Sequence, residues 1–178
     1  MPKKAFTLIE VLAVLVILSI LATLAFAGYQ QYMAKAAGPV CMSNLRNLGN
    51  SFQNYINDHG NRWPPHPSTS DPNSEISENY WIKLFEVNYQ IPANTWQCPI
   101  LKKNRVASSN GRVLKLHYIP SLFDGTPGRP MELNSGGKKH PWLMEISDAH
   151  GNGALMFFPQ LGVVSMNQLL RDNGIKSN

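Results

Sequence analysis

The stretch KKAFTLIEVLAVLVILSILATLAFAGY, residues 3–29, decides the organisation of this chain. Two lysines stand at its start, and residues 11–29 are almost wholly Val, Leu, Ile, Ala and Phe, with no charged side chain. At 1.5 Å per residue, a helix over those positions would be about 28 Å long, close to the hydrocarbon thickness of a bilayer. The sequence therefore predicts a membrane-spanning helix near the N-terminus.

Charge and composition place the remainder of the chain outside the membrane. The 178 residues are 43% hydrophobic, and the polar sequence after residue 29 carries scattered Trp, Tyr and Pro, as a water-soluble domain does. Lys3 and Lys4 precede the apolar run, and positive charge there holds that end in the cytoplasm, so the bulk of the protein would face outward. A net charge of only +5 gives no reason to expect a nucleic-acid partner.

The two cysteines, Cys41 and Cys98, would then lie in an oxidising compartment, where a disulfide is permitted. A bond between them would close a loop of about 57 residues and, in the chain-entropy model, stabilise the fold by about 4 kcal/mol. Two free buried thiols are the alternative.

Glu10 is the one acid at the edge of the apolar run. Placing a carboxylate in a membrane helix costs free energy, so a specific local role should offset that cost. Helix capping is one role, because TLIE, residues 7–10, fits the capping box and a first-turn carboxylate suits the helix dipole. Cleavage between Ala5 and Phe6 offers another. It would free an amine on Phe6, positively charged below about pH 8, that could pair with Glu10 of a neighbouring chain and set the register of a helix bundle.

A conventional secretory signal peptide is a competing interpretation. Lys3 and Lys4 would form its charged start, residues 11–24 its apolar segment, and AFA at residues 25–27 its cleavage site before Gly28. Residues 1–27 would then be removed, leaving a secreted soluble binding protein or enzyme.

The stretch AFTLIEVL, residues 5–12, resembles the class III signal of bacterial type IV pilins and type II secretion pseudopilins. The resemblance implies that a prepilin peptidase cuts between Ala5 and Phe6 and methylates the new amine of Phe6, and that Glu10 serves in assembly. In those families the residue before the cut is usually Gly, whereas this chain has Ala5. Ala is the smallest alternative, so we still expect cleavage.

The same resemblance implies a structural role and a location. The chain would be a subunit of a type II secretion pseudopilus or a type IV pilus-like filament, and not an enzyme. Its partners would be the prepilin peptidase, other pilin or pseudopilin subunits, an inner-membrane assembly platform and membrane lipid. It would cross the bacterial inner membrane once, with a cytoplasmic N-terminus and a periplasmic head, before entering a periplasmic or surface filament.

Downstream motifs narrow the resemblance. The stretches CMSNLRNLG at residues 41–49, WPP at 63–65 and QCP at 97–99 are similar to pilin-like proteins common in Planctomycetes and Verrucomicrobia. In that group a His, nine residues and Asp-Gly close the domain. Here nine residues follow His150, but Gln160, Leu161 and Gly162 stand where the Asp-Gly pair would be.

The expected fold is α+β and pilin-like, with a long N-terminal helix packed on a small antiparallel sheet. We predict a leader at residues 1–5, a transmembrane and assembly helix at 6–29, an amphipathic continuation at 30–58 with a break near 38–39, and a globular head at 59–178. The break is predicted because Pro39 removes a helix hydrogen bond. After it, one apolar stripe should pack on the sheet, formed by Leu45, Leu48, Phe52, Tyr55 and Ile56.

Further elements are predicted from periodicity and turn residues. A short helix should carry an apolar face around Trp81 and Phe85. Residues 113–119 alternate as a half-buried strand does, and residues 142–146, 154–158 and 163–164 should form an antiparallel meander. A last helix should start at a capping box on Ser165.

No metal or catalytic site is predicted. The histidines and Asp148 show no motif-like spacing for zinc, and no stretch has the alternating acids of a calcium loop, although some secretion pseudopilins bind calcium. Ser147, Asp148 and His150 lie close in sequence without a recognisable nucleophile motif. We therefore expect no cofactor.

Overall fold

The computed structural model describes residues 8–69, 71–123, 131–132, 140–151 and 153–172, leaving aside the side chains of residues 24–36 and 131–132. The chain forms two compact units, Met1–Ala36 and Ala37–Asn178.

Helix α1 spans Leu8–Asp58, 51 residues, and runs through Pro39. The helix therefore does not melt near residues 38–39, where a kink or a short melted stretch was predicted. A proline removes only one rung of the helical ladder, and the turns after it are held by the core, because Cys41, Leu45 and Leu48 are fully buried. Among the described residues, no helix combines the length and apolarity needed to cross a membrane.

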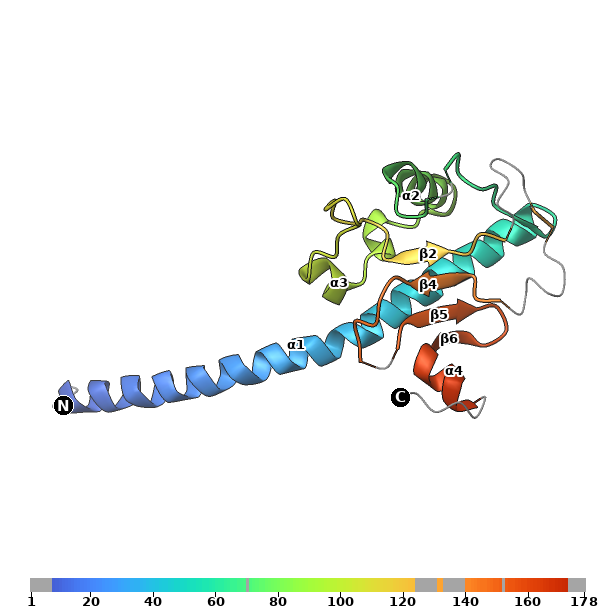
Figure 1. Cartoon of the computed structure of the whole chain (residues 1–178). Coiled ribbons are helices and arrows are strands. Elements are labelled where there is room, and N and C mark those ends of the chain that lie inside the picture. The colour runs from blue at the N-terminus through green and yellow to red at the C-terminus, as the bar shows by residue number, and fades with distance from the viewer. Residues whose placement is uncertain (1–7, 70, 124–130, 133–139, 152, 173–178) are drawn as a thin grey trace, which may run out of the picture. The chain divides into compact units, whose positions relative to one another are not determined.

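A four-stranded antiparallel sheet forms the centre of the second unit (Figure 1). Its order is β2 (Tyr118–Pro120), β4 (Leu143–Glu145), β5 (Leu155–Phe158) and β6 (Gly162–Ser165). Helix α4 (Met166–Asp172) follows at once, and the Ser165 hydroxyl accepts a hydrogen bond from the Gln168 N–H at 3.2 Å, as the capping box predicts. The expected α+β class and the antiparallel meander are confirmed.

The strand predicted over residues 113–119 is found only at its end, in β2. The N–H groups of Lys115 and Leu116 donate instead to the carboxylate of Glu78, at 2.8 and 3.3 Å, and the His117 N–H donates to the Trp96 carbonyl at 2.8 Å. A backbone satisfied by a buried side chain has no need of a neighbouring strand. The alternation of apolar and polar residues over 113–119 gives no sign that Glu78 is the hydrogen-bond partner of this segment.

The remaining elements surround the sheet and the second half of α1. Helix α2 (Glu75–Tyr89) is the predicted short helix, with Trp81 and Phe85 buried. Four short elements were not predicted: the 3₁₀ helix η1 (Ala93–Trp96), helix α3 (Pro99–Lys103), and the two-residue strands β1 (Arg62–Trp63) and β3 (Met131–Glu132), which pair antiparallel. All four are too short for periodicity to detect.

The core forms around the predicted stripe of α1. Each of its five members is at most 7% exposed. The ring of Phe52 lies within 4.3–6.3 Å, centroid to centroid, of four other aromatic rings, those of Trp63, Trp81, Phe85 and Trp96. This stripe therefore joins α2 and η1 to α1.

Strand β5 packs closely on α1 at Gly49. A Cβ atom at this position would lie 2.4 Å from Cε2 and Cζ of Phe157, far inside normal carbon contact. Glycine here is required by packing, because only a residue without a side chain lets the Phe157 ring lie against the helix backbone.

Candidate functional site

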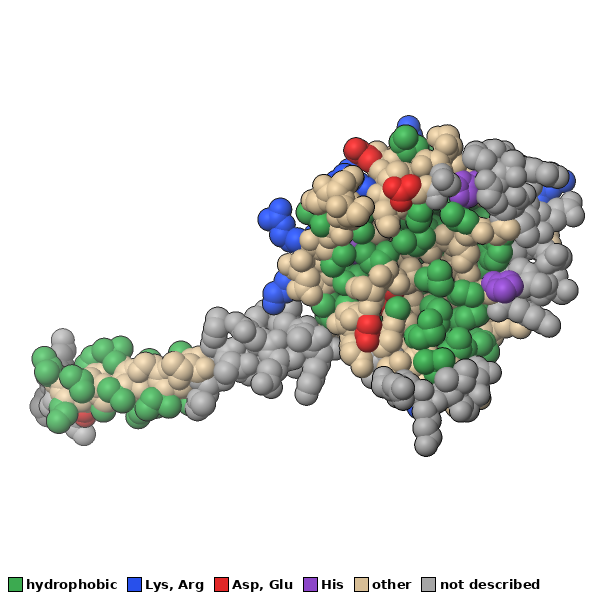
Figure 2. All heavy atoms as spheres, viewed as in Figure 1, with side chains coloured by type: hydrophobic (Ala, Val, Ile, Leu, Met, Phe, Trp, Pro, Cys, Tyr) green, Lys and Arg blue, Asp and Glu red, His purple; other side chains and the backbone are tan. Residues whose placement is uncertain are grey.

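The described part of the first unit is an apolar helix with its side chains exposed. We call residues 8–23 the stem segment. Its large apolar side chains are 50–86% exposed, and Figure 2 shows hydrophobic atoms over its surface. A contiguous exposed apolar surface of this kind marks a site of contact with other proteins or with lipid.

The two hydroxyl side chains of the stem segment bond to their own helix. Ser19 Oγ donates to the Leu15 carbonyl at 2.9 Å or the Val16 carbonyl at 2.8 Å, and Thr23 Oγ1 donates to the Ile20 carbonyl at 2.7 Å. Their hydrogen-bonding needs are met without water, so they add little cost if the segment is transferred to an apolar environment.

Glu10 is exposed and lies in the first turn of α1, where a carboxylate suits the helix dipole. Ala5 and Phe6, the residues on either side of the predicted cut, lie outside the described residues, as does Thr7 of the predicted capping box.

The second unit holds the other predicted site residues. Cys41 on α1 and Cys98, just before α3, form a disulfide with their Cα atoms 5.0 Å apart, and both residues are fully buried. The bond spans 57 residues of sequence and links α1 directly to the segment that leads into α3. Free buried thiols, the alternative from the sequence, are not present in this structure.

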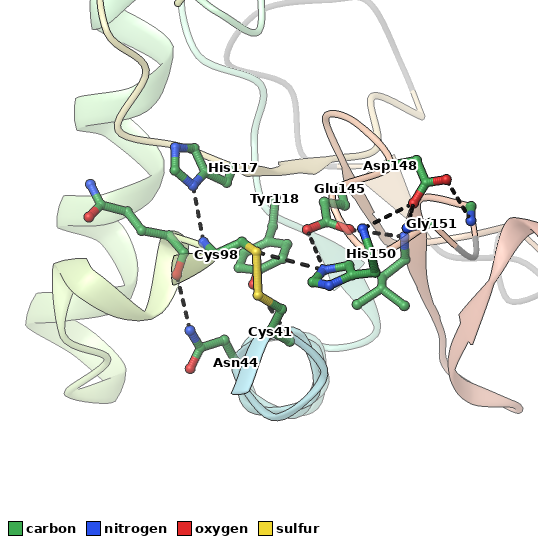
Figure 3. A network of polar contacts seen from close by, with 12 residues as sticks. Cys41, Asn44, Cys98, His117, Tyr118, Glu145, Asp148, His150 and Gly151 are labelled. Carbon is green, nitrogen blue, oxygen red and sulfur yellow. Dashed lines mark hydrogen bonds and ion pairs between the residues drawn. A yellow bond between two sulfur atoms is a disulfide. The ribbon is translucent and has the colours of Figure 1, made fainter. Parts of the chain in front are cut away.

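A histidine and a buried carboxylate lie against this disulfide (Figure 3). Nε2 of His150 is 3.7 Å from Cys98 Sγ and 3.1 Å from Glu145 Oε1. The Glu145 side chain is fully buried, and its other oxygen, Oε2, accepts the Leu155 N–H at 3.3 Å. Burial raises the pKa of Glu145, while the neighbouring His150 acts against that rise.

The loop between β4 and β5 presents His150 to this cluster. Asp148 organises the loop, because its carboxylate accepts the backbone N–H groups of His150 at 3.1 Å, Gly151 at 2.7 Å and Gly153 at 3.0 Å. Gly151 and Gly153 both have positive φ, 72° and 82°, which allows the chain to wrap around the carboxylate. Asp148 therefore positions the loop backbone, while the imidazole of His150 faces Glu145 and Cys98.

His117 supports the other side of the disulfide. Its Nδ1 accepts the Cys98 N–H at 3.0 Å, which requires a neutral ring with the proton on Nε2. The ring is 1% exposed, and no described residue offers Nε2 a hydrogen-bond partner. Burial lowers the pKa of His117, so the ring stays neutral where an exposed histidine would begin to charge.

Two further hydrogen bonds hold the elements around the cysteines together. The Tyr118 hydroxyl donates to the Cys41 carbonyl at 3.2 Å, and the Asn44 side-chain amide donates to the Gln97 carbonyl at 3.2 Å. Burial and the nearby Glu145 raise the pKa of Tyr118, so this hydroxyl remains a donor. Helix α1 is thereby tied to β2 and to the segment before α3.

Glu145 and His117 belong to this site but were not predicted from the sequence. A signal for Glu145 was present, because strand alternation puts it on the same face as the buried Leu143. No comparable signal marked His117, whose burial depends on Trp96 and Cys98. The other histidines lie elsewhere: His59 stacks on Tyr55, His66 bonds to the Pro67 carbonyl and His140 is exposed.

Comparison with known families gives a match at the N-terminal end of the chain. Residues 1–26 match the family model described as the prokaryotic N-terminal methylation motif. The match agrees with a type IV pilin-like or pseudopilin precursor that a prepilin peptidase processes. No curated protein and no solved structure matches the chain significantly. The resemblance of the head to the Planctomycetes and Verrucomicrobia group stays a prediction.

Proposed function

From the methylation motif over residues 1–26, we propose that the chain is a pilin-like structural subunit of a type II secretion pseudopilus or a type IV pilus-like filament. A prepilin peptidase cuts between Ala5 and Phe6 and methylates the amine of Phe6. The apolar helix stays on the mature chain and packs against the same helix of other copies. The role is structural, not catalytic.

The observation that carries this proposal is the exposed apolar surface of the stem segment next to the methylation motif. Eleven large apolar side chains at 50% exposure or more would be costly in water, since each buried Val, Leu or Ile side chain is worth about 1.5–3 kcal/mol. Lipid before assembly and neighbouring helices after assembly both remove that cost. Membrane anchorage is part of the proposal and is supported by the sequence of residues 11–29.

Glu10 supplies alignment between copies. In a bundle of apolar helices, a carboxylate is stable only beside a charge of opposite sign, and the amine of Phe6 lies four residues away in sequence. Pairing the Phe6 amine of one chain with Glu10 of its neighbour fixes the axial register, because a shifted neighbour leaves both charges unpaired in apolar surroundings.

The location follows from the same elements. Before assembly the chain crosses the inner membrane once, with Lys3 and Lys4 in the cytoplasm and residues 59–178 in the periplasm. Its partners are the prepilin peptidase, other subunits, the inner-membrane assembly platform and membrane lipid.

The mature N-terminus tests the proposal. Intact-mass measurement and N-terminal sequencing of chain produced in a host with a prepilin peptidase should give methylated Phe6 as the first residue. A chain that begins at Gly28 has lost the helix on which assembly depends, and it would establish the secreted alternative.

Glu10→Ala tests the pairing. This variant should enter the membrane as the wild type does but fail to enter filaments recovered by shearing. Glu86→Ala, which removes an exposed acid from α2, is the matched control and should assemble normally. Wild-type incorporation of Glu10→Ala would contradict the alignment role, even with Phe6 correctly processed.

A further inference from the structure

The second unit brings together four side chains that are known zinc ligands. The donor atoms of Cys41, Cys98, Glu145 and His150 all lie within 4.8 Å of one another. We call these four residues the CCEH cluster. They come from α1, the N-cap of α3, β4 and the loop after β4, so the cluster depends entirely on the tertiary fold.

We propose that the CCEH cluster is a redox-gated zinc site, which binds Zn²⁺ when Cys41 and Cys98 are reduced and excludes it when they form the disulfide. The two states use the same sulfur atoms, so they are mutually exclusive. This inference is independent of the filament role.

The distances suit a tetrahedral ion. Zinc bonds of about 2.3 Å to sulfur and 2.0–2.2 Å to nitrogen or oxygen place neighbouring ligand atoms about 3.3–3.8 Å apart. The contact from His150 Nε2 to Cys98 Sγ, 3.7 Å, already has such a length, and the contact to Glu145 Oε1, 3.1 Å, is close to it. Reduction frees the two sulfurs to move apart to the edge that joins them, and the other three distances between ligand atoms are at most 4.8 Å.

The direction of the imidazole supports the same geometry. In Figure 3 the ring of His150 lies beside the disulfide and below the Glu145 carboxylate, with dashed lines to both. One nitrogen, Nε2, faces both neighbours. Nε2 therefore faces the space that a shared cation would occupy, and it would bind a metal there once it carries no proton.

The surroundings match those of a structural metal centre. Both cysteines are fully buried, the Glu145 side chain is fully buried and the His150 side chain is 9% exposed, so a bound ion would be shielded from water. Outer contacts hold two ligands in place. The Leu155 N–H bonds Glu145 Oε2, and the Asp148 carboxylate fixes the loop that carries His150. Such contacts are typical around metal ligands.

The ligand set selects the ion. Two thiolates and an imidazole favour zinc over the hard cations calcium and magnesium, which prefer oxygen. On binding, Zn²⁺ replaces the two thiol protons, which leave to solvent, and the proton between His150 Nε2 and Glu145 Oε1 moves to Nδ1 or to solvent. The thiolates and the carboxylate then outweigh the ion's charge by one. Opening the disulfide takes two electrons and two protons from a dithiol or phosphine reductant.

The experiment uses the full chain in detergent, reduced with a phosphine under anaerobic conditions and freed of reductant. It is titrated with Co²⁺ as a spectroscopic probe and then with Zn²⁺. We expect one ion per chain, a sulfur-to-cobalt charge-transfer band and visible bands of tetrahedral cobalt, all lost when Zn²⁺ displaces it. The oxidised chain should give no such band.

Two variants assign the ligands. His150→Ala and Glu145→Gln should each weaken Zn²⁺ binding by at least about tenfold, since changes beyond the ligands already cost about 10–100-fold. Glu145→Gln keeps an acceptor for the Leu155 N–H, and His140→Ala, which removes an exposed histidine elsewhere, is the matched control.

Circular dichroism of each sample distinguishes loss of ligands from loss of fold. A reduced chain that stays folded without a thiolate band would overturn the proposal, as would equal affinity in His150→Ala. A reduced chain that unfolds and is not restored by Zn²⁺ would overturn it as well. Refolding on addition of Zn²⁺ supports it, because the ion then supplies folding energy.

Discussion

Gly49→Ala offers a sharp test of how strand β5 packs on α1. The new methyl group would lie 2.4 Å from Cε2 and Cζ and 2.5 Å from Cδ2 of Phe157, where carbon contacts normally need about 3.5–4.0 Å. The ring or the strand must therefore shift by more than about 1 Å. Phe157 is 5% exposed and cannot turn into solvent without leaving the core.

Two effects of opposite sign determine how much Gly49→Ala changes the free energy of unfolding. Overpacking a filled core costs about 1–3 kcal/mol, and a clash this short belongs at the upper end. Alanine in place of glycine inside a helix returns about 1 kcal/mol. The net effect is a loss of about 2 kcal/mol in the free energy of unfolding.

Urea unfolding followed by tryptophan fluorescence measures this loss. All four tryptophans of the chain lie in the second unit, at most 4% exposed, so the signal reports on that unit. With a urea slope of about 2 kcal/mol per molar for a chain of this size, the midpoint should fall by about 1 M.

A double-mutant cycle isolates the contact. In a Phe157→Ala background the clashing atoms are gone, so Gly49→Ala should change sign and stabilise by about 1 kcal/mol. The coupling between the two sites is then about 3 kcal/mol. The packing argument fails if Gly49→Ala stabilises the wild-type background as well.

Two further predictions concern buried ionisable groups. Glu78→Ala removes the carboxylate that accepts the N–H groups of Lys115 and Leu116 and pairs with Arg112, and it should lower the free energy of unfolding by about 3 kcal/mol. Glu78→Gln keeps an acceptor for the two N–H groups but gives up the charge opposite Arg112, so it should lose less than Glu78→Ala in the same urea assay; equal losses would contradict the acceptor role. The pKa of His117 is lowered in the folded state from the usual histidine value of 6.5. As the pH falls through 6.5, the unfolded chain therefore takes up this proton before the folded chain does, and the free energy of unfolding should fall. The raised pKa of Glu145 changes stability with the opposite sign, so the wild type is compared with His117→Asn, which keeps an acceptor for the Cys98 N–H. The loss of stability on lowering the pH should be smaller in this variant. An unchanged pH dependence would show that His117 is not its cause.

Much of the head could be predicted from local patterns. The stripe from Leu45 to Ile56 was predictable from its helical period, and the strands β4, β5 and β6 from short apolar runs bounded by turn residues. The capping of α4 by Ser165 was predictable because its donor lies three residues away. Prediction failed where the partner was distant, as for residues 113–117, whose backbone bonds to Glu78 and to the Trp96 carbonyl.

The sequence by itself determined the apolar N-terminal helix, the methylation motif, the acid at Glu10 and the α+β class, because each depends on composition or on spacing within a few residues. Only the tertiary structure decided that Cys41, Cys98, Glu145 and His150 share one buried site. Their positions span more than a hundred residues, and contacts over such separations follow from how helix, strand and loop pack, a choice that no local pattern encodes.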